Sequence, residues 1–493
     1  MPARPPFVYR ALVGLVRFVV RVFFGEVAVE GREHVPRDRG GLLVAWHPNG
    51  LIDPALILAT FPGRIVFGAR DGLLRWPLLG RLFRALGTVP IYRPSDTAGM
   101  TDEARRALNA RSLDALAAEL AAGSFAALFP EGRSHDLPHV AELKTGAARL
   151  FHRASALADE GPRPAIVPVG LHYDRKDLFL SDVLVAYHPP LDLPPDLLLH
   201  PGETDDEAHE RARRLTDAIE HALVHVVRAT DDWHLHTLMH RARTLLRAEA
   251  AARTGARPDR DSVAERALGF AQVWHGYRVR RETHADEIEP LRADLTRYHR
   301  LLRALRLEDA DLDDAPRRSG LAALAGLTLR ALAVFVLLPP LLLVGYVVNG
   351  PVHLLMRAAA RRFSTAPKDV ATVKILVGFL LYPLAWLGVG VATALLWPRL
   401  HALVPALPDL PLLAGLVAAL LAFASGVLVV NYVALARETA RAVRARLAHR
   451  RRRDVVAALR RTRADLHDRF VALGEGLDLP DDVTDLGVAA GDG

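Results

Sequence analysis

Gly41-Leu42-Leu43-Val44-Ala45-Trp46-His47 is the stretch that decides the fold, because an apolar run ends there directly at a histidine. A run this short is typical of a strand that is buried on both faces of a sheet. Similar runs recur along residues 27–203 with helical patterns between them. The alternation predicts an α/β fold, a mixed sheet flanked by helices. The expected strands are Gly41–Trp46, Arg64–Phe67, Ser124–Leu128, Ala165–Leu171 and Val183–Tyr187, and the expected helices include Ser112–Ala122 and Ala141–Ala154.

A candidate catalytic pair follows the first strand. Five residues separate His47 from Asp53, and Pro48, Asn49 and Gly50 among them favour a turn. Such a turn would let Asp53 accept the Nδ1 proton of His47, which leaves Nε2 free as a general base. The alternative is a loop histidine beside an aspartate that caps a helix.

A second candidate turn, Phe129-Pro130-Glu131-Gly132-Arg133-Ser134, follows another apolar strand. Arg133 can bind a phosphate through two hydrogen bonds, and Gly132 lets the backbone approach a ligand closely. Arg93 lies beyond a further short strand. Lys144 is expected in the first helical turn of the helix that follows the Phe129–Ser134 segment. A base and several cations from separate loops suit a hydroxyl next to a phosphate. For each cation alone, a surface salt bridge is the alternative.

Composition narrows the class of protein. The chain has 493 residues, 24% charged and 51% hydrophobic, which suggests a soluble part joined to a membrane part. It has no cysteine, which excludes a cysteine nucleophile, a thiolate metal site and a disulfide scaffold. The net charge of +7 is weak evidence for an anionic partner, and no nucleotide-binding phosphate loop is present, so no nucleic-acid partner is expected. No metal is implied; the alternative cluster of His234, His236 and His240 lacks an acidic ligand motif.

Three apolar stretches, Ala331–Val348, Ile375–Trp397 and Leu410–Ala436, predict a membrane region. At 1.5 Å per residue the second covers about 34 Å, enough for a bilayer core of about 30 Å. Basic residues flank the outer ends of the second and third stretches, whereas only Arg399 lies between them. This predicts a multi-pass protein whose hairpin ends and catalytic domain face the cytoplasm. Pro339-Pro340 predicts that the first stretch is broken, re-entrant or interfacial, with a plain third span as the alternative.

The two ends of the chain are also candidates for membrane contact. Arg17 and Arg21 share one face of an amphipathic helix, which suits the headgroup region; packing on the protein's own core is the alternative. The basic tail suits an anionic membrane, or is a solvated helix with balanced charges. The predicted divisions are an interfacial helix (1–26), a catalytic α/β domain (27–203), a helical extension (204–318), the membrane region (319–436) and the basic helical tail (437–493).

Four segments in order resemble the motifs of the glycerolipid acyltransferase superfamily. They are His47–Asp53, Gly87–Pro94, Phe129–Ser134 and Ile166–Gly170. The usual first motif has four residues between His and Asp; the five found here are similar to a branch that includes fungal glycerol-3-phosphate/dihydroxyacetone-phosphate acyltransferases. His135-Asp136, the extension around Asp232–Arg247 and the segment Ala371–Ile375 also resemble that branch.

The resemblance implies direct transfer of a fatty acyl group from acyl-CoA or acyl carrier protein to glycerol 3-phosphate or dihydroxyacetone phosphate, in phosphatidic acid and phospholipid synthesis. His47 would be the base and Asp53 its partner, with no cofactor beyond the acyl co-substrate. A 1-acylglycerol-3-phosphate or other lysophospholipid acceptor is the alternative, and a non-catalytic membrane lipid-binding protein is a remote one. The residues implied in the acyl-acceptor site are Arg93, Glu131, Gly132 and Arg133, while Pro168 would shape the acyl-donor side.

Overall fold

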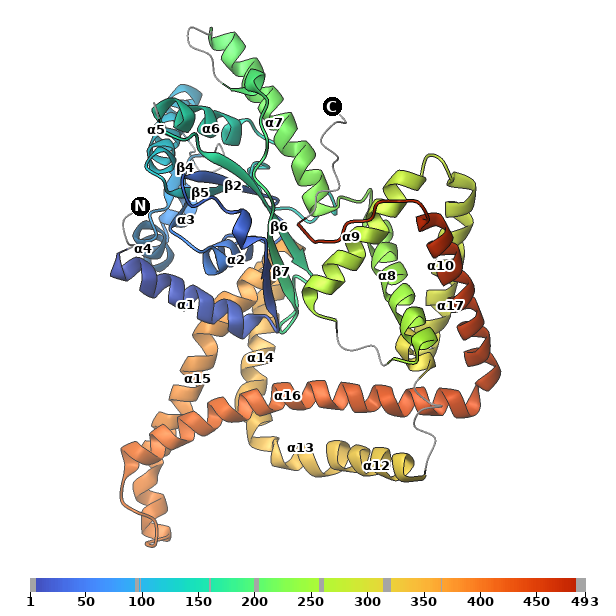
Figure 1. Cartoon of the computed structure of the whole chain (residues 1–493). Helices are drawn as coiled ribbons and strands as arrows, with labels where there is room; N and C mark the ends of the chain where they lie inside the picture. The colour runs from blue at the N-terminus through green and yellow to red at the C-terminus, as the bar shows by residue number, and fades with distance from the viewer. Residues whose placement is uncertain are drawn as a thin grey trace.

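The computed structural model is built on a seven-stranded sheet with the order β1-β7-β6-β2-β5-β3-β4 (Figure 1). All neighbouring strands are parallel except β6 and β7, so the predicted mixed sheet with flanking helices is confirmed. The strands are β1 (Val27–Glu30), β2 (Gly41–Ala45), β3 (Ile65–Arg70), β4 (Val89–Ile91), β5 (Phe125–Leu128), β6 (Ala165–Tyr173) and β7 (Val183–Tyr187). The structure describes residues 6–93, 97, 99–158, 161–198, 204–256, 261–313, 321–364 and 366–484.

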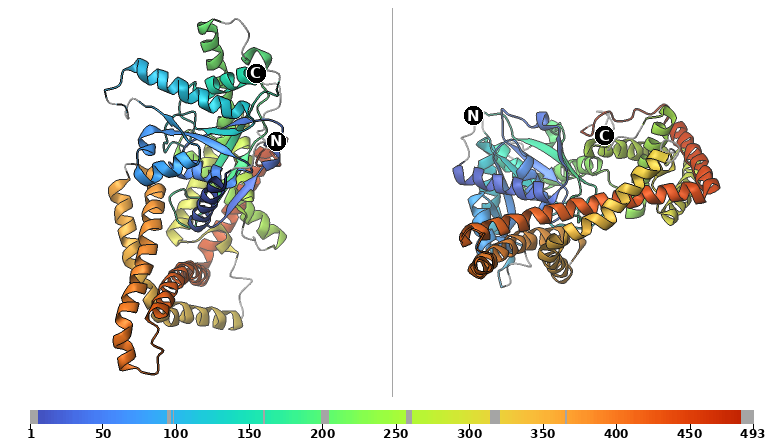
Figure 2. Two further views of the ribbon diagram at one scale, coloured as in Figure 1. Left: turned by 90° about the vertical axis from the view of Figure 1, so that its left-hand side faces the viewer. Right: turned by 90° about the horizontal axis from the view of Figure 1, so that it is seen from below.

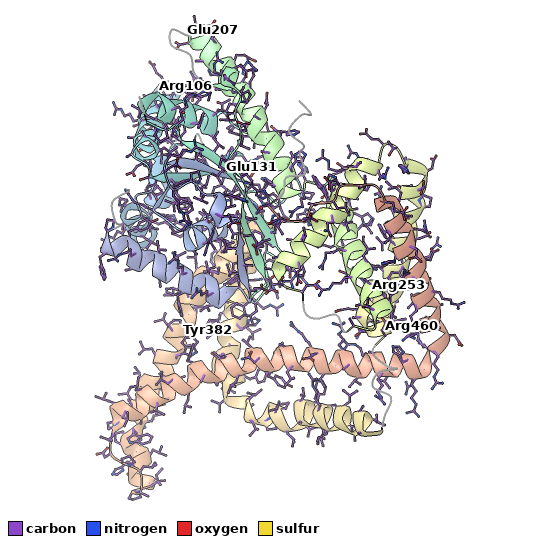
Figure 3. The ribbon with its side chains drawn as sticks, viewed as in Figure 1. Arg106, Glu131, Glu207, Arg253, Tyr382 and Arg460 are labelled. Atoms are coloured by element: carbon purple, nitrogen blue, oxygen red, sulfur yellow. The ribbon has the colours of Figure 1, made fainter. Side chains whose placement is uncertain are left out.

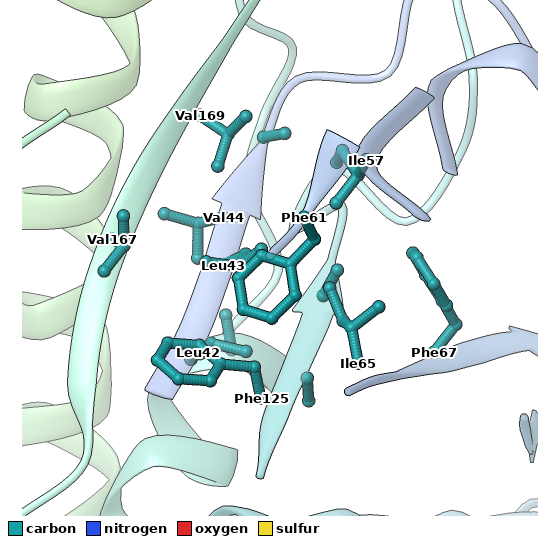
Figure 4. Close-up of a cluster of buried hydrophobic side chains, with 14 of the residues drawn as sticks. Leu42, Leu43, Val44, Ile57, Phe61, Ile65, Phe67, Phe125, Val167 and Val169 are labelled. Carbon is teal, nitrogen blue, oxygen red and sulfur yellow. The ribbon is translucent and has the colours of Figure 1, made fainter. Parts of the chain in front are cut away.

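β2 is a central strand, and all five of its residues are buried between β6 and β5. Leu42 and Leu43 point to opposite faces and pack among side chains such as Phe61 and Phe125 (Figure 4). Burial on both faces explains why this strand is an unbroken apolar run. Because β2, β3, β4, β5 and β6 run in the same direction, the residues that follow them meet at one edge of the sheet.

Seven helices among the described residues belong to the same core as the sheet or adjoin it. The predicted helix from Ala141 begins only at Gly146, because Lys144 N donates to Pro130 O at 2.8 Å and the chain before it remains a loop. Lys144 therefore lies before the helix and not in its first turn. The helices are α1 (Phe7–Phe23), α2 (Ile52–Thr60), α3 (Asp71–Leu74), α4 (Pro77–Ala85), α5 (Asp102–Ala121), α6 (Gly146–Leu157) and α7 (Asp205–Val227).

α7 packs on the sheet although the predicted division at residue 204 separates the two. Its residues Leu215, Ile219 and Leu223 are fully buried in the same apolar core as β2 and β6. The helix starts at a Thr204–Glu207 capping box, so the local sequence determines where it begins. The apolar stripe along one face of α7 determines that it packs against the sheet.

α1 combines the two alternatives that its sequence left open. One face packs on the protein, with Val13, Val20 and Phe23 buried, while Phe18 and other large apolar side chains stay exposed. The expectation that Arg17 reaches toward lipid headgroups differs from the structure, because Arg17 Nε donates to Ala59 O at 2.8 Å at the end of α2.

A second, all-helical core lies beside the sheet and unites distant segments (Figure 1). Leu245 of α8, Leu295 of α10 and Leu466 of α17 are buried together. Arg463, 1% exposed, bonds to Glu249 Oε2 at 2.8 Å. One face of the part of the tail in α17 is thus packed on the helical extension, while most of its other residues are exposed. The helices are α8 (Trp233–Thr254), α9 (Val263–Arg280), α10 (Ala285–Leu305) and α17 (Arg453–Gly474); short 3₁₀ turns are Arg32–His34, Pro195–Leu197 and Asp309–Leu312.

Three helical segments of the described chain are long and apolar enough to cross a membrane: Ala322–Leu341, Lys368–Leu403 and Pro411–Arg451. α14 and α15 run side by side away from the α/β domain (Figures 1 and 2). Asn349 of α14 ties this region together, since its Nδ2 donates to Ala422 O and its Oδ1 accepts from Trp386 Nε1 at 2.9 Å. The helices are α12 (Leu321–Leu332), α13 (Leu338–Leu341), α14 (Leu343–Phe363), α15 (Pro367–Leu403) and α16 (Pro411–Arg451).

The first apolar stretch, 331–348, does not form one continuous α-helix. It contains a π-helical segment, Ala333–Leu337, and an interruption at Leu342, two residues after Pro340. The chain changes direction there, from α12 and α13 into α14 (Figure 1). Proline has no backbone N–H to donate within a helix, so the Pro339-Pro340 pair explains the interruption beside it.

Candidate active site

His47 and Asp53 meet in the turn between β2 and α2, as their spacing predicts. His47 Nδ1 lies 2.7 Å from Asp53 Oδ2. Gly50 bends the intervening chain with a φ of +51°, a value that residues with a side chain rarely adopt. Asp53 is fully buried, whereas 16% of the His47 side chain is exposed. A buried carboxylate that accepts the Nδ1 proton leaves Nε2 on the open side of the ring as an acceptor of protons.

Asp53 is held by more than the histidine. Its Oδ2 also accepts from Asn49 N at 2.7 Å, and its Oδ1 accepts from the Tyr173 hydroxyl at 2.5 Å. Burial, together with the charge of Asp53, raises the pKa of Tyr173 well above its ordinary value, so the hydroxyl remains a donor. The sequence reasoning missed Tyr173. The available signal was its place at the end of β6, the strand paired with β2.

The ring of His47 is stacked on Phe129, the first residue after β5. The two ring centroids are 4.1 Å apart and the planes differ by 18°. Stacking limits rotation of the imidazole, and the Asp53 bond fixes its remaining freedom. The base is therefore preorganised by two side chains, one after β5 and one in the first turn of α2.

Glu131 has a different place from the one expected in an acyl-acceptor site. It is 3% exposed, and its Oε2 accepts from His47 N at 2.8 Å. Its Oε1 accepts from Ala141 N at 2.9 Å and lies 2.6 Å from His135 Nε2. Both carboxylate oxygens are thus used within the protein, inside the α/β domain and above Tyr382 of α15 (Figure 3). The structure makes Glu131 a clamp between the two turns.

Gly132, Arg133 and Lys144 lie together at the exposed rim of the second turn. Gly132 has a φ of +68°, and a Cβ built there would lie 3.7 Å from Lys144 Cγ. Arg133 is exposed, and the Lys144 ammonium, also exposed, pairs with Glu142 at 3.0 Å. Both cations are therefore open to solvent at this turn.

Arg93 and Pro168 stand further from the histidine. Arg93 follows β4, three strands from β2, so its backbone is about 14 Å away along the sheet edge at about 4.8 Å per strand. It is half-buried and lies on the rim of the site. Pro168 is buried inside β6, paired with Val44, and its carbonyl accepts from His188 N at 3.0 Å. Pro168 can therefore shape the site only through the course of the strand.

The first two turns of α15 and the β6–β7 loop contact the His47 turn. Thr372 Oγ1 accepts from Leu51 N at 3.2 Å. Lys176 Nζ donates to Pro48 O at 3.2 Å and pairs with Asp136. No sequence pattern placed these side chains at the site, because their segments are far apart along the chain.

The alternative histidine cluster has a packing role in the structure. The rings of His236 and His240 lie 4.8 and 4.5 Å from Phe270, between α8 and α9. Burial lowers the pKa of His236 to about 4 and that of His240 to about 3. Among the described residues no three His, Asp or Glu side chains gather as a metal site.

Two family models match the chain, one over most of the α/β domain and one from within the helical extension into the basic tail. The "Acyltransferase" model matches residues 26–172, and the "Glycerol-3-phosphate acyltransferase 2 C-terminal domain" model matches residues 272–475. The region that carries the site therefore matches an acyltransferase domain. The resemblance of the four sequence motifs to the glycerolipid acyltransferase superfamily is thereby confirmed.

Curated relatives that are similar to the chain include two proteins of Saccharomyces cerevisiae. Glycerol-3-phosphate O-acyltransferase 1 is 25% identical over 252 residues, which cover 50% of this chain and 31% of the relative. Glycerol-3-phosphate O-acyltransferase 2 is 41% identical over 64 residues, 13% of this chain and 8% of the relative. The chain therefore spans about a third or less of the length of these relatives. Among solved structures, the 1-acyl-sn-glycerophosphate acyltransferase PlsC of Thermotoga maritima is 20% identical with a TM-score of 0.30, covering 44% of this chain and 79% of PlsC.

Proposed function

We propose that the protein is a membrane O-acyltransferase that moves a fatty acyl group from acyl-CoA or acyl carrier protein to glycerol 3-phosphate or dihydroxyacetone phosphate. The observation that carries the proposal is the bond between His47 Nδ1 and Asp53, which leaves Nε2 facing the open side of the site. The C-terminal family model and the yeast relatives favour the glycerol phosphate acceptor.

The reaction needs one base and no covalent acyl-enzyme. His47 Nε2 takes the proton of the acceptor hydroxyl while that oxygen attacks the thioester carbonyl. A carbon–oxygen bond forms and the carbon–sulfur bond breaks. The imidazolium then returns the proton to the thiolate that leaves, so atoms and charges balance. Arg133 and Lys144 would hold the phosphate of the acceptor, with Arg93 at the rim.

The carbonyl oxygen becomes negative during this step and needs donors. The amides of His47 and Asn49 donate to Glu131 and Asp53, and the amide of Gly132 donates to Phe129 O. These amides are engaged before substrate arrives. We assign the oxyanion to other backbone amides of the two turns.

The membrane arrangement that fits this reaction is a hairpin of α15 and α16 with both ends on the side of the catalytic domain. α15 starts at the active site, and α16 continues into α17, which packs on α8 and α10. The basic residues flanking the hairpin favour the cytoplasm for that side. The acyl donor, a cytoplasmic thioester, and the phosphate acceptor would both reach the site from water.

The test is an acyl-transfer assay with the purified full chain in lipid nanodiscs. Labelled acyl-CoA and acyl carrier protein are each offered with glycerol 3-phosphate, dihydroxyacetone phosphate or 1-acylglycerol 3-phosphate. We expect turnover with the first or second acceptor and a loss of about 10² to 10⁴ in His47→Ala. His209→Ala, an exposed histidine on α7, is the matched control and should retain full activity. Turnover with 1-acylglycerol 3-phosphate alone would overturn the proposed glycerol phosphate acceptor. Unchanged turnover in His47→Ala would overturn the proposed role of His47 as the base.

A further inference from the structure

The first two turns of α15 pack on the His47 turn, although the same helix continues as a candidate membrane span. Thr372 Oγ1 accepts a hydrogen bond from Leu51 N at 3.2 Å. Leu51 is the N-cap residue of α2, the helix that carries Asp53 in its first turn. Thr372 therefore satisfies a backbone donor that the helix itself leaves unpaired, and it does so beside the catalytic pair.

α15 approaches Gly50 so closely that a side chain there would force its neighbours to shift. A Cβ built at that position would lie 3.0 Å from Thr372 Oγ1 and 3.3 Å from Lys368 O. Gly50 thus meets two requirements, a positive φ and the approach of α15. The absence of a side chain at Gly50 therefore permits the contact between the membrane helix and the His47 turn.

The preceding turn of α15 also reaches the second active-site turn. Lys368 Nζ donates to Ser134 O at 2.6 Å, next to Arg133. Lys368 and Thr372 are four residues apart, so they project from the same face of α15. One face of one helix therefore contacts both turns, which Glu131 already links to each other.

The start of α15 is anchored in the core of the α/β domain. Ala371 is fully buried in the core of the sheet, and Ile375 packs against it. α15 has 37 residues and is about 55 Å long at 1.5 Å per residue, while a bilayer core is about 30 Å thick. The helix is long enough to cross the bilayer and still place its first turns at the active site.

We propose that Thr372 and Lys368 are positioning residues for acyl transfer, through which a membrane helix holds the two active-site turns in place. The inference rests on the proposed function for its kinetic consequences but not for its structural ones. It places His47 at the point where α15 leaves the domain for the membrane. An acyl chain released at this point would be at the lipid surface.

The kinetic test compares Thr372→Val, which has the same shape without the hydroxyl, with Thr372→Ser, which keeps the acceptor. Thr393→Val is the matched control, because Thr393 lies on the same helix and bonds only within it, to Val389 O at 2.8 Å. We expect kcat of Thr372→Val to fall about five- to tenfold, as for one lost hydrogen bond, with KM for both substrates changed less than twofold. Thr372→Ser and Thr393→Val should keep at least half of the wild-type kcat.

Lys368 is tested by the same logic. Lys368→Met should lower kcat, and Lys368→Arg should restore most of it. A rise in KM for the phosphate acceptor in Lys368→Met, with kcat unchanged, would make Lys368 a substrate-binding residue and overturn the proposed positioning role. A Thr372→Val enzyme with wild-type kcat, or a Thr372→Ser enzyme as slow as Thr372→Val, would overturn the inference for Thr372.

A structural readout separates failure of this inference from failure of the proposed function. Backbone amide hydrogen exchange across residues 47–53 is measured in nanodiscs for the wild type, Thr372→Val and Thr393→Val. We expect faster exchange only in Thr372→Val, whether or not the protein turns over the substrates offered. Equal exchange in all three proteins would show that α15 does not hold the turn, even if acyl transfer is observed.

Discussion

The backbone nitrogen of His47 donates to Glu131 Oε2 at 2.8 Å, so the carboxylate of one active-site turn binds the backbone of the other. The second oxygen of Glu131 accepts from Ala141 N, at the far end of the loop that Glu131 begins. A charged acceptor is therefore shared by two backbone donors inside the protein. Such bonds are stronger than neutral ones. With His135 Nε2 also 2.6 Å from Oε1, the protein itself occupies most of the acceptor sites of this carboxylate.

Glu131→Gln is expected to damage the base and not acceptor binding. The glutamine presents an NH₂ group where one of the two oxygens accepted an amide proton, so one donor loses its partner. We expect kcat to fall about ten- to hundredfold, with little change in KM for glycerol 3-phosphate. Arg133→Ala should do the reverse and raise that KM. Steady-state kinetics with both substrates distinguishes the two patterns.

Glu103→Gln, on the exposed surface of α5, is the control for the change of charge and should behave as the wild type. A Glu131→Gln enzyme with normal kcat and a KM raised tenfold for the acceptor would return Glu131 to the acceptor site.

Tyr173→Phe removes the hydroxyl that donates to Asp53 Oδ1. Asp53 is fully buried, so that oxygen would lose its partner without gaining water, at a cost of about 1–3 kcal/mol of stability. We expect kcat to fall about tenfold because the aspartate can then rotate away from His47. The melting midpoint and kcat are measured together. Tyr277→Phe on α9 is the control, since its hydroxyl has no hydrogen-bond partner among the described residues. An unchanged kcat in Tyr173→Phe would show that Asp53 is held by its other bonds alone.

The sequence predicts most of the sheet and the central pair, because both depend on local patterns. β7 matches its expected bounds, Val183–Tyr187, and the pairing of His47 with Asp53 follows from the turn formers between them. The type of the flanking helices follows from periodicity, but their ends do not. α6 starts five residues late because the loop before it is held by tertiary hydrogen bonds, including the Glu131 clamp.

The remaining parts of the site depend on contacts that local patterns do not encode. Tyr173, Thr372 and Lys368 reach the His47 region through the pairing of strands and the packing of α15, across gaps of over a hundred residues. The role of Glu131 was missed for a related reason. A charged residue on a tight turn suggests an exposed ligand, and only the fold reveals that two backbone amides surround it.

The stability of the folded protein should depend on pH through His188, which follows β7 and contacts Thr484. Burial and the nearby Arg228 lower the pKa of His188 to about 3, and its Nδ1 donates to Thr484 O at 3.0 Å. In the unfolded chain the pKa of a histidine is about 6.5. Below that value the unfolded chain takes up a proton that the folded protein does not bind, so stability falls as the pH drops from about 6.5 toward 3.

The melting midpoint in nanodiscs, measured by near-ultraviolet circular dichroism at pH 7.5 and pH 5, checks this sign. Other groups also titrate in this range, so the comparison is with His188→Gln, which keeps an amide donor but cannot be protonated. We expect a smaller drop in midpoint for His188→Gln than for the wild type. Identical drops in the two proteins would remove His188 as a source of the pH dependence.

The crossing of α15 and α16 depends on two glycines in contact. A Cβ built at Gly415 would lie 2.6 Å from Gly390 O, and one at Gly390 would lie 2.8 Å from Gly415 O. Small residues let membrane helices approach this closely, and their packing is a main source of association within lipid. Gly388 lies on the same helix as Gly390, yet a Cβ there would meet nothing within 4 Å.

Gly415→Val should therefore separate the two helices, whereas Gly388→Val should be tolerated. Both changes replace a helical glycine with the same side chain, so their effects on helix propensity are similar. The difference between the two variants therefore reports the contact between the helices. Overpacking costs about 1–3 kcal/mol, which we expect as a melting midpoint several degrees lower for Gly415→Val in nanodiscs. Because the start of α15 holds the His47 turn, displacement of the helix should also lower kcat. Equal midpoints and equal kcat in the two variants would show that this glycine contact does not hold the hairpin together.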